Sequence, residues 1–249
     1  MKVVGIIPAR LESSRLPQKA LADICGIPMV GHTYCRAKLS TALNELYVAT
    51  DSEAIKAVIE KVGGKVIMTS RAHKTGSDRI AEAARMIDAD IIVNIQGDEP
   101  LLNPDHIDQA VQALMQDKNI QVSMLVTPYT KKNSPSDIKA VLDLEDHILY
   151  SSRDDLPSSA RSAVDVMWKV CFIVPFRKEF LLRFSSWEQT PLEKIEYQEY
   201  LRILEHGVKI KAVRVDHADI SVDTPEDLNI VKELMRTDKI FTRYSQLWI

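Results

Sequence analysis

The sequence predicts an α/β fold whose sheet is mostly parallel. Short apolar runs rich in β-branched residues alternate along the chain with segments in which apolar residues recur at helical spacing. The runs are apolar throughout, as expected of strands that helices cover on both faces. The length of 249 residues, of which 45% are hydrophobic, fits one large α/β domain or one domain with a modest subdomain.

The strands of this sheet are predicted at residues 3–7, 46–50, 65–68, 90–95 and 122–127. Between them, apolar positions in residues 55–62 and 107–114 follow the i, i+3, i+4, i+7 pattern of amphipathic helices. Capping boxes at residues 190–193 and 224–227, each with proline at the first helical position, predict two further helices. The second of these ends near Met235, and a last strand is predicted at residues 208–215.

The middle of the chain, from about residue 129 to 187, has a less regular pattern. Strands are predicted at residues 139–143, 148–151 and 166–174, separated by polar turns. Strands joined in this way indicate an antiparallel extension, which is also a candidate dimer surface.

Charge and composition exclude several classes of function. The net charge of −3 gives no general attraction to nucleic acid or to anionic membranes. No apolar run approaches the length of a signal peptide or a membrane span. Three widely spaced cysteines without a CxxC pair indicate free thiols in a reducing cytoplasm, rather than disulfides or a zinc site.

The loop that follows the first strand, residues 8–19, concentrates positive charge. It carries Arg10, Arg15 and Lys19, and the hydroxyls of Ser13 and Ser14 add hydrogen-bond donors. Arginine and lysine bind phosphate oxygens well, and ligands of parallel sheets lie beyond the carboxyl ends of the strands. The loop therefore suits a triphosphate, although a solvated basic loop would have the same composition. Neither a P-loop nor a GxGxxG motif is present.

Two aspartates follow other strand ends. Asp98 comes after the predicted strand 90–95 and directly after Gly97, which admits close approach of the backbone; Asp223 precedes the capping box at 224–227. Such carboxylates are good ligands for Mg²⁺. Alone, Asp98 could simply accept turn hydrogen bonds and Asp223 could favour a helix N-terminus. Together with the basic loop, they suit a magnesium–triphosphate site.

Several motifs in order resemble the Kdo (3-deoxy-manno-octulosonate) cytidylyltransferases, also called CMP-Kdo synthetases. They are IIPAR with SSRLP in the opening loop, VATDSE at 48–53, TGSDR at 75–79, NIQGDEP at 94–100, SWEQTPLEKIE at 186–196 and VDTPEDL at 222–228. The resemblance implies a Rossmann-like three-layer α/β/α nucleotidyltransferase domain over residues 1–249. It also implies an antiparallel subdomain, at about residues 129–206, for dimerisation and sugar binding.

The resemblance also implies a reaction. CMP would pass from CTP, with Mg²⁺, to the anomeric hydroxyl of an eight-carbon sugar acid, with release of pyrophosphate, in a cytoplasmic homodimer that serves lipopolysaccharide biosynthesis. Asp98 and Asp223 become metal ligands, and Arg15 and Lys19 stabilise charge on the triphosphate. The residues assigned to the nucleotide are Ala9, Arg10, Ser13, Ser14, Thr75, Ser77, Arg79 and Gln96. Arg79 could equally form a surface pair with Asp78.

The sequence departs from the family where relatives bind the sugar. Lys169-Val170-Cys171 replaces an HxG motif, Glu199-Tyr200 replaces Glu-Gln, and Asp154-Asp155 replaces an uncharged pair. In the opening loop, Gln18 and Ala20 replace a glycine and a proline. The changes suggest the 8-amino analogue of Kdo, whose ammonium could pair with Asp154 and Asp155. Lys169 would repel this ammonium unless it lies elsewhere, for instance near the C1 carboxylate of the sugar. Plain Kdo remains an equal candidate, and Arg153 and Arg161 are candidates for the sugar carboxylate.

Two other functions remain open. One is CMP activation of another acidic sugar such as a sialic acid, and the other is a non-catalytic nucleotide-binding protein. His32 and His73 could serve as a general base, but lone histidines are more often structural. Trp168 and Trp187 fit packing better than base stacking.

Overall fold

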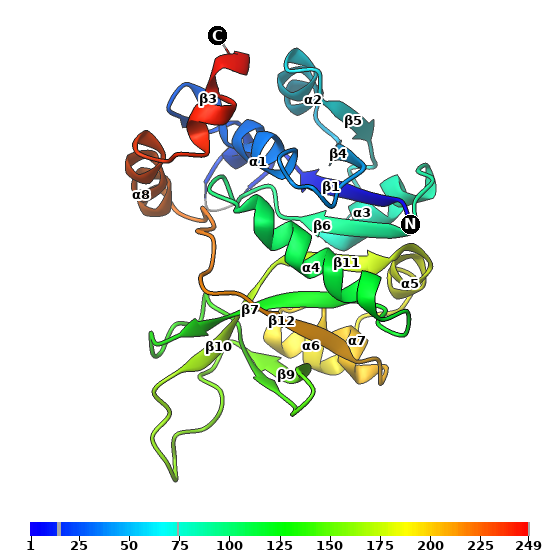
Figure 1. The fold of residues 1–249 in the computed structure, drawn as a ribbon, viewed down its shortest axis with the longest axis vertical. Helices are drawn as coiled ribbons and strands as arrows, with labels where there is room; N and C mark the ends of the chain where they lie inside the picture. The colour runs from blue at the N-terminus through cyan, green and yellow to red at the C-terminus, as the bar shows by residue number, and fades with distance from the viewer. Residues whose placement is uncertain (14–15, 74, 249) are drawn as a thin grey trace. The chain divides into compact units, whose positions relative to one another are not determined.

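The computed structural model describes residues 1–13, 16–73 and 75–248. It divides the chain into two compact units. The first unit comprises residues 1–108 and 219–249, and the second comprises residues 109–218. Figure 1 labels the elements in chain order. No helix within the described ranges has the length and apolar character needed to cross a membrane.

The first unit contains four parallel strands in the order β6-β1-β4-β5. They are β1 (Val3–Ala9), β4 (Glu45–Thr50), β5 (Lys65–Met68) and β6 (Ile91–Ile95). Val4 and Ile6 are fully buried, as is all of β6, because helices cover both faces of the sheet. The α/β class and the parallel pairing are therefore as the sequence predicts, with strand ends within two residues of their predicted positions.

Three helices connect these strands: α1 (Met29–Ala37), α2 (Glu53–Lys61) and α3 (Gly76–Arg85). The chain runs from β1 through β4 to β5 in one direction along the sheet, then returns past β1 to β6. Right-handed crossovers place α1 and α2 on one face and α3 on the other, which makes three layers. The strand order reverses between β1 and β6, so ligands are expected where the loops after these two strands diverge.

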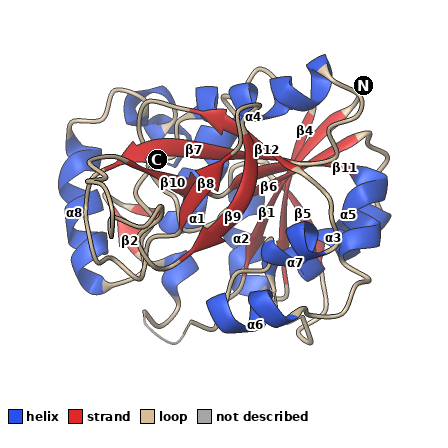
Figure 2. Ribbon diagram, turned by 90° about the horizontal axis from the view of Figure 1, so that it is seen from below, coloured by secondary structure: helices blue, strands red, loops and turns tan. Residues whose placement is uncertain are grey.

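Shorter elements complete the first unit. The 3-10 helix η1 (Lys19–Leu21) and the hairpin of β2 (Asp23–Ile24) and β3 (Ile27–Pro28) precede α1. Helix α8 (Pro225–Arg236) lies beside β2 (Figure 2), and the 3-10 helices η2 (Phe241–Arg243) and η3 (Ser245–Trp248) follow it. A small core of Ile24, Met29, Val222, Val231 and Met235 holds α8 in place.

The second unit is built around a closed barrel in the order β10-β7-β12-β9-β8. Its strands are β7 (Ser123–Tyr129), β8 (Lys139–Leu142), β9 (His147–Ser152), β10 (Met167–Cys171) and β12 (Ile210–Arg214). All pairings are antiparallel except that of β12 with β7. Its other elements are β11 (Ile173–Arg177), α5 (Lys178–Phe184), α6 (Pro191–Glu196) and α7 (Leu201–Glu205). Helix α4 (Pro104–Gln116) begins before the boundary between the units and ends after it.

Two strand predictions are wrong in detail. The run at 122–127 was expected in the parallel sheet, but β7 belongs to the barrel, where both of its faces are also buried. A strand that is buried on both faces has the same apolar sequence in a parallel sheet and in a barrel, so the sequence cannot distinguish the two. The single strand expected at 166–174 is two strands, because β10 pairs with β7 and β8 while Phe176 of β11 bridges to Val122.

Candidate active site

Lys19 lies between the two aspartates that the sequence singles out. Its ammonium Nζ is 2.6 Å from Asp98 Oδ2 and 3.1 Å from Asp223 Oδ1. Burial lowers the pKa of Lys19, but the two carboxylates offset this, so the pKa is raised above its ordinary value. The ammonium is therefore charged across the physiological range. Asp98 and Asp223, which lie 79 and 204 positions after Lys19 in the sequence, both contact its ammonium group.

One backbone and one side-chain hydrogen bond link the segments that carry these aspartates. The N–H of Val222 donates to the carbonyl of Asp98 at 2.9 Å, and the hydroxyl of Ser221 donates to Glu99 at 3.2 Å. Asp223 then directly precedes α8, whose capping box is formed by Thr224 and Asp227 as predicted. The segment that carries Asp223 is thus joined to the loop that carries Asp98.

Gly97 allows this loop to approach the end of β1, as predicted. A Cβ at this position would lie 2.9 Å from the carbonyl oxygen of Pro8. On the other side, the hydroxyl of Thr33 in α1 donates to the carbonyl of Gly97 at 3.2 Å. Only glycine fits here without displacing backbone, so Asp98 is held close to the carboxyl end of β1.

A cavity of about 280 Å³ opens beside these side chains, entirely within the first unit. Its described walls are Pro8, Ala9, Arg10, Glu12, Ser13, Lys19, Ala20, Met29, His73, Thr75, Gly76, Arg79, Gln96, Gly97, Asp98 and Asp223. These include all but three of the residues predicted for the nucleotide, the triphosphate or the metal. Ser77 is buried and does not line the cavity, and Ser14 and Arg15 lie outside the described residues.

Asp98 and Asp223 are suited to hold Mg²⁺. Oxygens from both carboxylates lie within 3.1 Å of one cationic atom, and carboxylate oxygens are the protein ligands that Mg²⁺ prefers. Mg²⁺ usually takes only one or two protein carboxylates and completes its shell with water and substrate phosphates. The donor set therefore fits a metal that arrives with a nucleotide.

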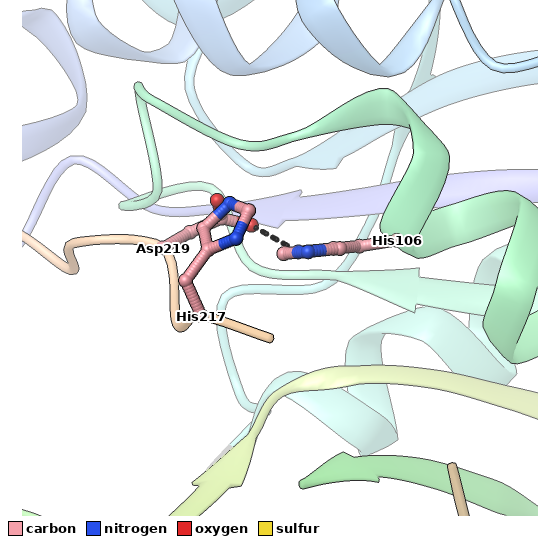
Figure 3. Close-up of side chains that lie close together, drawn as sticks. All are labelled: His106, His217 and Asp219. Atoms are coloured by element: carbon pink, nitrogen blue, oxygen red, sulfur yellow. Dashed lines mark hydrogen bonds and ion pairs between the residues drawn. The ribbon is translucent and has the colours of Figure 1, made fainter. Parts of the chain in front are cut away.

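Other groupings of histidine and carboxylate lie apart from this cavity. Nδ1 of His106 and Oδ2 of Asp219 form a buried hydrogen bond of 3.1 Å (Figure 3). In the second unit, Asp143 and Glu145 in the turn before β9 lie close to His147, the first residue of β9, and Asp143 accepts hydrogen bonds from the backbone N–H groups of the other two. The Asp143 side chain is therefore engaged in the hydrogen bonds of the turn itself.

The predicted base-binding residues are partly engaged in the fold. Thr75 caps α3 by accepting from the N–H of Asp78 at 3.1 Å. Arg79 is 4% exposed and donates to Thr69 at 2.6 Å and to Asp51 at 3.3 Å. The alternative of a surface pair between Arg79 and Asp78 is therefore wrong, because Asp78 belongs to the capping box and the guanidinium is buried.

His73 lines the cavity, although the sequence argument treated it as a structural histidine. Its Nε2 is hydrogen-bonded to Glu82 in α3. Position gives the only sequence signal for this residue, since it stands two residues before the TGSDR motif. His32, the other candidate base, is fully buried between Ile24 and Tyr244 and does not line the cavity.

The residues predicted for the sugar all lie in the second unit. Lys169 is paired with Asp137 at 2.5 Å, and Asp154 and Arg161 are exposed. Asp155 accepts from the N–H of Asn133 at 3.1 Å. Lys169 therefore does not present an unpaired positive charge.

Three more of these residues are held by the fold. Arg153 donates to the carbonyls of Pro135, Glu196 and Tyr197. Tyr200 is 2% exposed and stacks near Phe172, Phe176 and Phe184. Glu199 beside it is half-buried. Sugar binding by these residues stays a prediction, and the burial of Tyr200 does not favour it.

Comparison with known proteins agrees with this geometry. A family model described as cytidylyltransferase matches residues 4–210. The chain is 42% identical to the 3-deoxy-manno-octulosonate cytidylyltransferase of Geotalea uraniireducens (strain Rf4), over 95% of this chain and 100% of that protein. It is 41% identical to the protein of the same name from Protochlamydia amoebophila (strain UWE25), over 96% of each chain.

A solved structure is similar over nearly the whole chain. It is a CMP:2-keto-3-deoxy-manno-octonic acid synthetase complexed with CTP, with a TM-score of 0.92 and 34% identity over 95% of this chain and 99% of that one. A cytidylyltransferase from Leptospira borgpetersenii, at 19% identity and a TM-score of 0.66, shares the fold. The chain therefore belongs to the cytidylyltransferase family, among the 3-deoxy-manno-octulosonate cytidylyltransferases.

Proposed function

We propose that this protein transfers CMP from CTP to the anomeric hydroxyl of a Kdo-type sugar acid and releases pyrophosphate, as a step of lipopolysaccharide biosynthesis. The convergence of Lys19, Asp98 and Asp223 on one wall of the cavity carries this proposal. The names of the relatives support the same chemistry. A cytoplasmic location goes with the proposal, because the reaction consumes CTP.

The protein's part in the reaction is positioning and electrostatic stabilisation. The acceptor hydroxyl loses its proton to solvent as its oxygen forms a bond to the α-phosphorus of CTP, the bond from that phosphorus to the oxygen bridging to the β-phosphate breaks in line, and pyrophosphate takes the bonding electrons. Arg10 and Lys19 offer positive charge to phosphate oxygens along the cavity wall. Asp98 and Asp223 would hold Mg²⁺, which when bound neutralises charge on the phosphates. No covalent enzyme intermediate is required.

Removing the carboxylates tests this function. Asp98→Asn and Asp223→Asn are each expected to lower CTP-dependent pyrophosphate release by at least about 100-fold, because the metal site loses half of its protein charge. Lys19→Met should lower the rate by a similar factor. Glu60→Gln, which changes an exposed carboxylate of α2, is the matched control and should keep the wild-type rate.

A second readout separates metal binding from catalysis. Mn²⁺ binding followed by electron paramagnetic resonance, in the presence of CTP, should weaken in both aspartate variants and remain normal in Glu60→Gln. Wild-type pyrophosphate release by Asp98→Asn would refute the proposed site. Failure of the wild-type protein to release pyrophosphate with any acidic sugar would favour the non-catalytic nucleotide-binding protein.

For the acceptor, we propose the 8-amino analogue of Kdo beside Kdo itself. The objection that Lys169 would repel an ammonium is weakened by its ion pair with Asp137. Burial raises the pKa of Asp137, but hydrogen bonds from Lys169, Ser134 and Tyr129 lower it to about 2, so this carboxylate compensates the lysine charge at all working pH values. Asp154, which is exposed, is then the candidate partner for the ammonium.

A competition assay decides between the acceptors. Kdo, its 8-amino analogue and a sialic acid are offered together with CTP, and the CMP-sugars formed are quantified. Asp154→Asn should lower kcat/KM for the amino sugar by about tenfold and leave that for Kdo within about twofold. A higher kcat/KM of the wild type for Kdo would end the amino-sugar proposal, and preference for the sialic acid would change the acceptor class.

Residues 129–206, which lie within the second unit, are also proposed as the dimerisation and sugar-binding subdomain. This stretch exposes the large apolar side chains Leu149, Ile195 and Tyr197, at 61%, 74% and 86%. A homodimer that covers them would remove this apolar surface from water. Analytical ultracentrifugation should give a dimer for the wild type and a smaller species for Ile195→Asp with Tyr197→Ser. A monomeric wild type at micromolar concentration would contradict the proposal.

A further inference from the structure

His73 stands on the wall of the nucleotide cavity with a fixed ring orientation. Its Nε2 is hydrogen-bonded to the Oε2 atom of Glu82, and the same carboxylate oxygen accepts from the backbone N–H of Ser70 at 3.0 Å. The His73 side chain is 21% exposed and that of Glu82 is 31% exposed. A histidine held in this way by a carboxylate has one ring nitrogen occupied and the other left for a ligand.

The hydrogen bond to Glu82 also assigns the role of each nitrogen. The hydrogen bond from His73 lowers the pKa of Glu82, so this carboxylate is ionised and can only accept. Nε2 must then carry the proton. In the neutral ring, Nδ1 is consequently a hydrogen-bond acceptor.

Neighbouring polar groups of the same wall are already engaged. The hydroxyl of Thr75 accepts from the N–H of Asp78, and the guanidinium of Arg79 is directed to Thr69 and Asp51. The side-chain N–H of Gln96 donates to Asn94 at 3.2 Å. His73 thus adds an oriented hydrogen-bond acceptor to this wall, whose other polar side chains already form hydrogen bonds within the protein.

We propose that His73, oriented by Glu82, is a specificity-determining residue whose Nδ1 accepts a hydrogen bond from a donor that distinguishes CTP from other nucleotides. Two groups of CTP are such donors: the exocyclic amine, which UTP lacks, and the ribose 2′-hydroxyl, which dCTP lacks. An acceptor matched to either group disfavours the nucleotide without it, because the protein atom would then be left unpaired. The inference rests on the proposed use of CTP.

The test measures nucleotide affinity by isothermal titration calorimetry with Mg²⁺ at pH 8.5, where free imidazole is neutral. CTP, UTP and dCTP are each titrated into the wild type, His73→Ala, Glu82→Ala and the control His147→Ala. His147 lies in the second unit and does not line the cavity. Thermal unfolding of each variant confirms that it is folded, and Glu82→Ala keeps the imidazole if His73→Ala does not fold.

The expected result is a selective loss. His73→Ala should weaken CTP binding by about tenfold and Glu82→Ala by about threefold, while His147→Ala stays at the wild-type value. If the donor is the amine, His73→Ala leaves UTP binding unchanged and the preference for CTP over UTP shrinks by the same tenfold. If the donor is the ribose 2′-hydroxyl, His73→Ala leaves dCTP binding unchanged and the preference for CTP over dCTP shrinks by the same tenfold.

Other outcomes overturn the inference. Affinities of His73→Ala within twofold of the wild type for all three nucleotides would show that the ring makes no such contact. An equal loss of affinity for all three nucleotides would indicate that His73 only supports the cavity wall. A wild type that binds all three with equal affinity would show that there is no discrimination for His73 to provide. A wild type that binds none of them would instead refute the proposed use of CTP, so the two failures are distinct.

Discussion

Acidification from pH 7.5 to 5 is expected to destabilise the first unit through His32 in α1. The ring is fully buried, with its Nε2 at 2.8 Å from the carbonyl of Ile24 and its Nδ1 at 2.7 Å from the hydroxyl of Tyr244. The carbonyl can only accept, so Nε2 carries the proton and Nδ1 accepts from the tyrosine. A second proton on Nδ1 would place a charge in the core.

The structure gives the size of this effect. Burial and the nearby Arg36 lower the pKa of His32 from 6.5 to about 4, although the hydrogen bond to Ile24 opposes the shift. The unfolded chain therefore binds this proton below pH 6.5 and the folded chain only below about pH 4. The contribution of neutral His32 to the free energy of unfolding is therefore fully present above pH 6.5 and declines as the pH falls below that value. The full difference corresponds to about 3 kcal/mol, of which about 2 kcal/mol is lost by pH 5.

Urea unfolding at several pH values, for the wild type and for His32→Gln, measures the effect. The variant is less stable throughout because it loses packing, but it lacks the titrating ring. The free-energy advantage of the wild type over the variant should therefore shrink by about 2 kcal/mol from pH 7.5 to 5. A difference that stays constant within about 0.5 kcal/mol over that range, or a pKa of His32 near 6.5 by NMR, would refute the reasoning.

Three further predictions concern the free energy of unfolding. Gly97→Ala should cost about 1–3 kcal/mol, because its Cβ would lie 2.9 Å from the backbone carbonyl oxygen of Pro8. Gly76→Ala, whose Cβ would lie 3.6 Å from Pro8 Cγ, should change stability by less than about 1 kcal/mol. Equal costs for the two variants would contradict this prediction. Arg202→Met leaves a buried carboxylate unpaired and should cost about 3–5 kcal/mol, against under about 0.5 kcal/mol for the exposed Arg236→Met; chemical denaturation compares them. Gln18→Gly relieves a φ of 53° and should raise stability by up to about 1 kcal/mol; a loss would count against backbone strain at that residue.

Much of the candidate active site follows from the sequence because parallel sheets bind ligands at a known edge. Asp98 and Asp223 occur next to a predicted strand or helix end and Lys19 lies in the basic loop after the first strand, and the structure brings all three together. Gly97 could also be interpreted in advance, since a glycine between a buried strand and an aspartate suggests close backbone approach. These are local signals, carried by residues adjacent in sequence.

Other features depended on partners that lie far away along the chain. Lys169 looked like an obstacle to an ammonium until its pairing with Asp137, 32 positions earlier, was known. His73 looked like a lone histidine because Glu82, its hydrogen-bond partner, lies 9 positions later in the sequence, in α3. Arg79 was open to two interpretations until the burial of its guanidinium against Thr69 excluded one.

The sequence by itself determined the alternation of strands and helices, the chemistry of the cavity and the family, because spacing and residue type are local properties that motifs preserve. Only the tertiary structure decided which sheet β7 joins, where the strand expected at 166–174 divides, and which charged side chains are compensated. Strand pairing and ion pairing depend on contacts between distant residues, and an apolar run or a lone charge looks the same in sequence whichever partner the fold supplies.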